Sequence, residues 1–213
     1  MDDKNYMKTG TTTVGIICKD GVVIAADRRA TAGNLIASKK ADKVQLLSDN
    51  IAVTMAGTVS DAQLMIKYTQ AEIRLKKLRT NQDVSVKEAA NLMARMVYGN
   101  IRKPSMIPGI SHFIMAGKDN KGKSLYDIYA DGSIAEIEDY ISSGSGSVMA
   151  YGVLETLYHE DMTVEDGIKL AIKCINAAIQ RDSASGNGID IVSITDAGAK
   201  KVMEQAIEGK ITV

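Results

Sequence analysis

The chain has 213 residues with 26 basic and 26 acidic side chains, and 45% of its residues are apolar. This composition is typical of one compact domain and excludes a disordered, collagen-like or coiled-coil chain. A net charge of zero offers no attraction to nucleic acid or to an anionic membrane. The longest apolar run, Val22 to Ala26, is far shorter than the ~20 residues of a membrane span. We therefore expect neither nucleic-acid binding nor insertion into a membrane.

The rare residue types limit the chemistry further. Cys18 and Cys174 are the only cysteines and lie in apolar stretches, which favours packing as small hydrophobic side chains over a disulfide or a metal site. His112 and His159 are the only histidines, so we interpret both as structural or surface residues and expect catalysis without histidine, metal or cofactor. The first ten residues lack the apolar stretch of a secretory signal, which predicts a cytoplasmic location.

Strand patterns dominate the first quarter of the chain. Apolar residues alternate or run together at 14–18, 22–26, 44–47 and 51–55, with turn sequences between the segments. We interpret them as an antiparallel meander that forms one sheet.

Helical periodicity follows. Apolar residues recur at gaps of four and three from Leu64 to Leu78, which predicts a helix from about Val59 to Arg79. Ser85 and Glu88 form a capping box before a second apolar stripe, from Ala89 to Val97. Two neighbouring helices are expected here.

The second half repeats this order. Strand patterns occupy 110–116, 125–130 and 134–137, and helices are predicted at about 148–158 and 163–180. A strand at 189–195 and a last helix near 197–207 complete the chain. Alternating strand blocks and helix pairs predict an α+β sandwich of two antiparallel sheets with helices outside, and nothing marks a domain boundary.

Two segments resemble phosphate-binding loops. Residues 117–124 (GKDNKGKS) match the P-loop pattern, but the β-branched and aromatic residues that follow favour a strand leaving a hairpin over the helix that a P-loop requires. Residues 142–147 (SSGSGS) could present amides to an anion, or form a turn in which Ser147 caps a helix.

Three threonines open the first predicted strand directly after Gly10. Alone, such a run is ordinary for a strand. However, Asp27 closes the second strand, Lys43 precedes the third and Gly57 ends the fourth. Strand ends of one sheet can meet at one edge, where a rigid scaffold holds the side chains in register.

These and further motifs resemble the β-type subunits of archaeal proteasomes over essentially the whole chain. The matching segments are TTTVGI at 11–16, GVVIAADRRAT at 21–31, DKV at 42–44, MAGTVSDAQ at 55–63, GSGS at 144–147 and RDSASGNGIDI at 181–191. The resemblance implies a four-layer αββα sandwich of the N-terminal-nucleophile hydrolase type, and a threonine endopeptidase of unfolded proteins.

The resemblance also assigns a catalytic site. It implies Thr11 as nucleophile, Lys43 as the cation beside its hydroxyl, Asp27 as the partner of that lysine, and the Gly57 amide as oxyanion donor, where a side chain would crowd the substrate. It also implies that Ser145, Asp182 and Ser185 orient the amine and the attacking water. The serine pair before GSGS departs from the family pattern and could shift Ser145.

Activation and specificity are implied in the same way. Residues 1–10 are expected to be a propeptide, removed when Thr11 attacks the Gly10 carbonyl, which leaves residues 11–213 as one catalytic domain. The expected substrate pocket favours cleavage after apolar residues, and it is formed by Ala30, Thr31, Ala41, Met55 and Val59.

The family further implies partners: α-type subunits, other β-type chains in heptameric rings within a stack of four rings, and an ATP-dependent regulatory ATPase. The leading alternative is a non-catalytic β-type ring subunit with the same sandwich. Another N-terminal-nucleophile amidase, or the bacterial HslV type, is a weaker reading because the matched segments extend well beyond the nucleophile.

Overall fold

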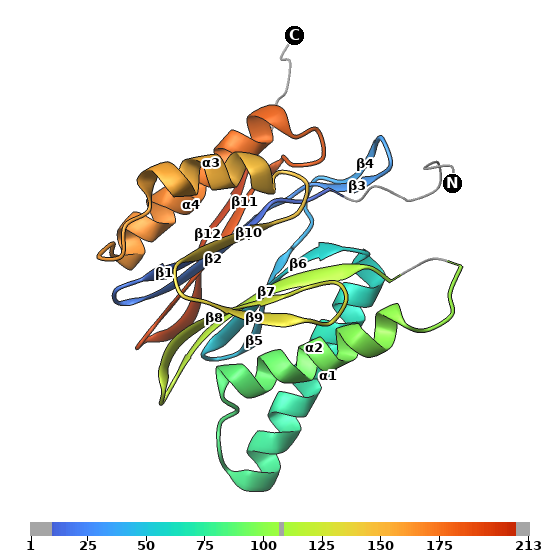
Figure 1. Ribbon diagram of the computed structural model, residues 1–213, viewed down its shortest axis with the longest axis vertical. Coiled ribbons are helices and arrows are strands. Elements are labelled where there is room, and N and C mark those ends of the chain that lie inside the picture. The colour runs from blue at the N-terminus through green and yellow to red at the C-terminus, as the bar shows by residue number, and fades with distance from the viewer. Residues whose placement is uncertain (1–9, 107–108, 208–213) are drawn as a thin grey trace.

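The computed structural model describes residues 10–106 and 109–207. Its elements stack as helices, sheet, sheet and helices (Figure 1), with α3 and α4 over one sheet and α1 and α2 under the other. This is the predicted α+β, αββα sandwich. Residues 1–9 of the expected propeptide lie outside the described residues.

The first sheet contains five antiparallel strands. In spatial order they are β10 (Tyr140–Ser143), β1 (Thr13–Cys18), β2 (Gly21–Asp27), β11 (Gly188–Thr195) and β12 (Gly198–Ala206). Every residue of β2 is buried, since this central strand is covered by helices on one face and by the second sheet on the other.

The second sheet is a five-stranded antiparallel meander in chain order. Its strands are β5 (Val44–Ser48), β6 (Ile51–Gly57), β7 (Ser111–Asp119), β8 (Gly122–Ile128) and β9 (Ile134–Ile137). A separate two-stranded hairpin, β3 (Ala30–Ala32) and β4 (Leu35–Ser38), connects the two sheets along the chain.

Side-chain alternation along the strands builds three apolar layers. On β7, Phe113 and Met115 pack toward α1 (Val59–Thr80) and α2 (Val86–Ile101), whereas Ile114 and Ala116 face the first sheet. The other outer layer lies between the first sheet and the second helix pair, α3 (Ser147–Leu157) and α4 (Val164–Arg181). Both sheets are therefore fixed on two faces, which makes their edges rigid supports for a site.

Two sequence interpretations are wrong. The first four predicted strands do not form one sheet, because β1 and β2 belong to the first sheet and β5 and β6 to the second. The last predicted helix is the strand β12, since Gly198, at φ +89°, closes a tight turn from Thr195 and returns the chain alongside β11. Residues of β12 are mostly exposed, so their apolar pattern was weak. The hairpin β3–β4 and strand β10 were not predicted.

The two loop motifs also have clear outcomes. Residues 117–124 form the β7–β8 hairpin, in which Asp119 pairs with Gly122, and a strand follows it as expected. The serine-rich segment leads into α3 with Gly146 as N-cap and no capping side chain, so the expected cap at Ser147 is wrong.

Cys18 and Cys174 are buried free thiols, and burial raises the pKa of each to about 12. Within residues 10–106 and 109–207, no helix is both long and apolar enough to cross a membrane.

Candidate active site

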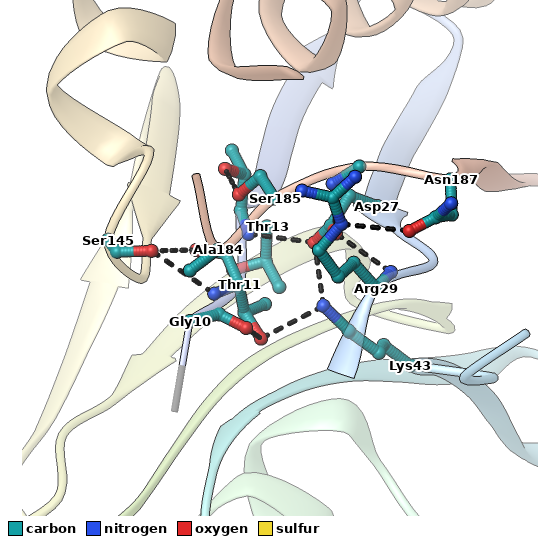
Figure 2. A network of polar contacts seen from close by, with 12 residues as sticks. Gly10, Thr11, Thr13, Asp27, Arg29, Lys43, Ser145, Ala184, Ser185 and Asn187 are labelled. Carbon is teal, nitrogen blue, oxygen red and sulfur yellow. Dashed lines mark hydrogen bonds and ion pairs between the residues drawn. The ribbon is translucent and has the colours of Figure 1, made fainter. Parts of the chain in front are cut away.

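Thr11 lies where the edges of the two sheets face one another. It precedes β1 of the first sheet, while Lys43 precedes β5 of the second. The Nζ atom of Lys43 lies 3.0 Å from Oγ1 of Thr11 and 2.7 Å from Oδ1 of Asp27, and it contacts both in Figure 2. Thr11 is 5% exposed, so its hydroxyl lies in a largely water-excluded setting. The site was expected at one edge of a single sheet, but it lies at the junction between two sheets.

Asp27 is fully buried and carries a dense set of donors. Its Oδ1 accepts from the Thr12 amide at 2.9 Å as well as from Lys43, and its Oδ2 accepts from the amides of Arg29 at 3.0 Å and Gly186 at 2.9 Å. Three backbone donors fix the position of this carboxylate. Asp27 is therefore held in place independently of Lys43, as an anchor to which the lysine is attached.

Lys43 is buried together with its partner; its side chain is only 5% exposed. Burial lowers the pKa of Lys43 below the ordinary value of 10.5, and the nearby Asp27 carboxylate partly offsets this effect. A lysine of reduced pKa exchanges a proton more readily near neutral pH than an exposed one. Its backbone is fixed as well, because the Lys43 carbonyl accepts from the Met55 amide at 3.0 Å.

A second polar group approaches Thr11 from the opposite side, at its nitrogen. The Thr11 N–H donates to Oγ of Ser145 at 3.3 Å, and Ser145 donates to Oδ2 of Asp182 at 2.6 Å. Ser185 donates to the same carboxylate oxygen at 2.6 Å. Ser145 follows β10, and Asp182 ends α4, so helix and sheet elements of the first half-sandwich converge here. The unusual serine pair does not move Ser145 away from Thr11.

The Gly10 carbonyl, which belongs to the bond expected to be cut, lies beside the Thr11 hydroxyl. The Thr11 hydroxyl donates to the Gly10 carbonyl oxygen at 2.6 Å, and the Gly10 N–H donates to Oγ1 of Thr31 at 3.1 Å. Glycine at position 10 has a steric reason: an added Cβ would lie 1.7 Å from Cβ of Ala184. Any larger residue would push this carbonyl away from Thr11.

Gly57 ends β6 with φ at +104°, a conformation that costs an L-residue strain. An added Cβ would lie 2.1 Å from the carbonyl oxygen of Ile110. A side chain here would thus collide with the backbone before β7, whether or not substrate is bound.

A cavity of about 340 Å³ opens beside Thr11. Its lining contains the whole predicted pocket, namely Ala30, Thr31, Ala41, Met55 and Val59, and also Gly57. Met55 is 6% exposed and Val59 is 43% exposed, so the former lies deep and the latter at the mouth. Lys40 and Asp42, both exposed and not predicted, add charge to the lining.

Two residues near Thr11 were missed from the sequence. Thr12 is fully buried, and its hydroxyl shares a 2.6 Å hydrogen bond with Ser185, which links the first strand to the loop after α4. Arg29 donates to Oδ1 of Asn187 at 2.8 Å and to the Ser183 carbonyl at 2.8 Å, so it fixes the same loop (Figure 2). Strand alternation offered a signal for Thr12. The contacts of Arg29 with this loop join residues more than 150 positions apart, so no local sequence pattern could indicate them.

The geometry combines a buried hydroxyl, an adjacent lysine, a carboxylate anchor and a separate group at the threonine nitrogen. No group of three or more histidine, cysteine, aspartate or glutamate side chains that could hold a metal ion occurs among the described residues. The arrangement can activate a hydroxyl with the chain's own groups, and it places an apolar-floored cavity next to that hydroxyl.

Comparisons with known proteins agree with this architecture. Residues 7–194 match the family model described as proteasome subunit. The chain is 43% identical over 208 residues to proteasome subunit beta of Methanosarcina barkeri, and the match covers 98% of this chain and 96% of that protein. It is 41% identical over 208 residues to proteasome subunit beta of Archaeoglobus profundus, with coverage of 98% and 94%. It is 42% identical over 207 residues to proteasome subunit beta of Methanobrevibacter smithii, with coverage of 97% of both chains. The chain therefore belongs to the proteasome subunit family, as one of its β-type members.

Proposed function

We propose that this β-type subunit is a threonine endopeptidase whose nucleophile is Thr11. The observation that carries the proposal is the contact of Lys43 with both the Thr11 hydroxyl and Asp27. A threonine hydroxyl needs a base to react at neutral pH, and a free α-amine on the same residue can supply one. An α-amine has an ordinary pKa of ~7.7 to 8.0, so a large neutral fraction exists at pH 7.5.

The amine arises by cleavage of the Gly10–Thr11 bond. Thr11 Oγ1 attacks the Gly10 carbonyl carbon, the C–N bond breaks, and the hydroxyl proton passes to the departing Thr11 nitrogen. Water then hydrolyses the resulting ester, which frees the propeptide as a carboxylate and restores the hydroxyl. The hydrogen bond from the Thr11 hydroxyl to the Gly10 carbonyl oxygen supports the proposal, because it places the hydroxyl beside the carbonyl group to be attacked. Before this cleavage the chain would be a zymogen, with residues 1–10 as its propeptide.

Peptide hydrolysis then repeats the same chemistry on a substrate. The neutral Thr11 amine accepts the hydroxyl proton, Oγ1 attacks the substrate carbonyl, and the amine returns the proton to the leaving nitrogen. The Lys43 ammonium favours the neutral amine by charge repulsion, and Asp27 holds the lysine. Ser145, Asp182 and Ser185 orient the amine and the water that hydrolyses the acyl ester. The Gly57 amide stabilises the oxyanion, a role worth ~3 to 4 kcal/mol in other enzymes.

Substrate preference follows from the cavity beside Thr11. The buried Met55 and the small side chains of Ala30 and Ala41 favour an apolar residue before the scissile bond, which is a chymotrypsin-like preference. Thr31 and Gly57 lie where the backbone of an extended peptide would pair. The exposed Lys40 and Asp42 add charges to the lining but are not predicted to select the residue in the pocket.

Assembly is proposed from the family alone. We expect heptameric β-rings stacked between α-type rings, fed with unfolded chains by an ATP-dependent regulator in the cytoplasm. Native mass spectrometry of the co-produced α- and β-type chains checks the stoichiometry.

The deciding experiment compares wild-type particles with Thr11→Ala particles on a fluorogenic peptide ending in leucine or tyrosine. We expect hydrolysis by the wild type, a chain that starts at Thr11 by mass spectrometry, and no turnover by the assembled variant. Equal activity in both particles, or an active particle that retains Met1, would contradict the proposal. Wild-type particles that assemble but never cleave would support the alternative, a non-catalytic ring subunit.

A further inference from the structure

A Ser–His–Asp cluster lies outside the threonine site, in the layer between the two sheets. Nδ1 of His112 lies 2.8 Å from Oγ of Ser143, and its Nε2 lies 2.5 Å from Oδ1 of Asp127. His112 is on β7 and Asp127 on β8, both in the second sheet, whereas Ser143 ends β10 of the first sheet. The histidine–serine hydrogen bond therefore crosses from one sheet to the other.

The cluster is not arranged as a second nucleophilic site. Asp127 is 1% exposed and Ser143 is 4% exposed, so a substrate carbonyl could not reach the hydroxyl. The ring of His112 stacks against Tyr129 with centroids 5.2 Å apart, which further encloses it. Asp127 and Ser143 are buried and His112 is partly exposed, and the hydrogen bonds that join the three side chains serve instead to select one relative placement of the strands that carry them.

The hydrogen-bond directions are set by the carboxylate. An ionised Asp127 only accepts, so Nε2 of His112 must carry a proton, and in the neutral ring Nδ1 accepts from the Ser143 hydroxyl. In this arrangement the hydrogen bond between the sheets runs from the Ser143 hydroxyl to the His112 ring.

Each end of this bond is next to one side of the threonine site. Ser143 directly precedes Gly144, where an added Cβ would lie 2.0 Å from the Thr11 carbonyl oxygen, and Ser145 follows. At the other end, His112 pairs with Ala56, and the preceding Ser111 pairs with Gly57. Ser145, the proposed orienting residue of the amine, is therefore two positions after Ser143. Gly57, the proposed oxyanion donor, is one position after Ala56, the residue of β6 that pairs with His112.

We propose that His112, Asp127 and Ser143 form an inter-sheet latch that sets the separation between the Ser145 side and the Gly57 side of the catalytic site. The three are positioning residues, because none of them contacts Thr11. This inference rests on the proposed function, since the latch would hold Ser145 and Gly57 in the positions that the reaction at Thr11 requires. Loss of the latch is expected to lower turnover while the substrate cavity, which it does not line, keeps its affinity.

The chain offers a matched control at the far end of the same layer. Lys123 at the start of β8 donates to the carbonyl of Cys18 at the end of β1, and this contact also joins the two sheets. Thr11 precedes the opposite end of β1, so K123M removes an inter-sheet contact that is remote from the site. Both K123M and S143A are expected to lower the melting temperature of the particle.

The test compares kcat and KM of assembled wild-type, S143A, S143T and K123M particles on one hydrophobic fluorogenic peptide. We expect S143A to lower kcat roughly 5- to 20-fold with KM within about twofold, as for the loss of one positioning hydrogen bond. S143T, which keeps the hydroxyl, is expected to recover most of kcat, and K123M is expected to leave kcat unchanged.

An unchanged kcat in S143A, or an equal loss of kcat in K123M, would overturn the latch as a catalytic device. If S143A does not assemble, S143C decides, because it preserves volume but hydrogen-bonds weakly; wild-type turnover in assembled S143C would overturn the proposal equally. Inactive wild-type particles would instead refute the proposed peptidase, so the two failures are distinguishable.

Discussion

The two sheets contribute unlike halves to the site. The first sheet and its loops surround Thr11 with a continuous hydrogen-bonded group that includes Asp27, Ser145 and Asp182. The side of the second sheet supplies one contact to Thr11, from Lys43 just before β5, and the floor of the adjacent cavity at Met55. In the proposed peptidase, the first sheet would orient the Thr11 nitrogen, and the second would supply the lysine cation and the floor of the substrate cavity. Variants on the two sides should fail in different ways.

The largest effect is expected from the single contact of the second sheet. Lys43→Met keeps the length of the side chain but removes the ammonium, so we expect kcat/KM to fall by roughly 10³-fold or more. Asp27 retains three backbone donors, which should preserve the fold. Lys39→Met, an exposed neighbour outside the cavity, serves as control. Kinetics on assembled particles test this, and turnover above a tenth of wild type would remove Lys43 from the mechanism.

The next effect concerns the end of β6. Gly57→Ala adds a Cβ 2.1 Å from the Ile110 carbonyl in a backbone of positive φ, so we expect kcat to fall by about 10²-fold. Gly122→Ala is the matched control, because Gly122 has φ +118° but no atom within 4 Å of an added Cβ. It should cost only backbone strain of about 1–2 kcal/mol and spare kcat. Equal kinetics of the two variants would argue against an oxyanion role for Gly57.

The pH dependence of kcat/KM should distinguish the Thr11 amine, on the side of the first sheet, from Lys43, on the side of the second. The Thr11 amine must be neutral and Lys43 must be charged, so kcat/KM should rise as the amine loses its proton and fall as Lys43 does. Because burial lowers the pKa of Lys43, the alkaline fall should begin below pH 10.5, with about a tenfold loss per pH unit beyond it. Rates measured from pH 6 to 11 test this. An alkaline limb at or above the ordinary lysine value would contradict the role of a buried cation.

The smallest effect is expected in substrate choice. Met55→Ala enlarges the floor of the cavity and should shift preference from leucine toward phenylalanine by about fivefold in kcat/KM, since pocket volume sets such ratios. Val59→Ala changes a side chain at the mouth and should shift the same ratio less than twofold. Competing peptide substrates measure both ratios. A larger shift in Val59→Ala than in Met55→Ala would reverse the assignment of floor and mouth.

Local patterns in the sequence predicted most elements of the sandwich and the ends of the strands that carry Thr11, Asp27 and Lys43. Periodicity identifies a strand but not the sheet to which it belongs, so the division of the first four strands between two sheets required tertiary packing. β12 was misread because an exposed edge strand lacks a buried face to impose alternation.

The polar partners that were missed have a common cause. Thr12 contacts Ser185 across 173 positions, and Arg29 contacts Asn187 across 158. No spacing rule connects residues so far apart in the chain. His112 was interpreted as structural or surface, and its two hydrogen-bond partners, in β8 and β10, became visible only when those strands were placed beside it.

In the proposed mechanism, cleavage of the Gly10–Thr11 bond depends on groups that only the folded chain brings together. Thr11 meets Ser145 across 134 positions and Lys43 across 32, so a chain still emerging from the ribosome has the hydroxyl but lacks the later groups that accompany it. A truncated or unravelled copy would likewise lose these groups together. Under the proposed mechanism, the chain would therefore gain peptidase activity only after it has folded, and would lose that activity when its fold is damaged.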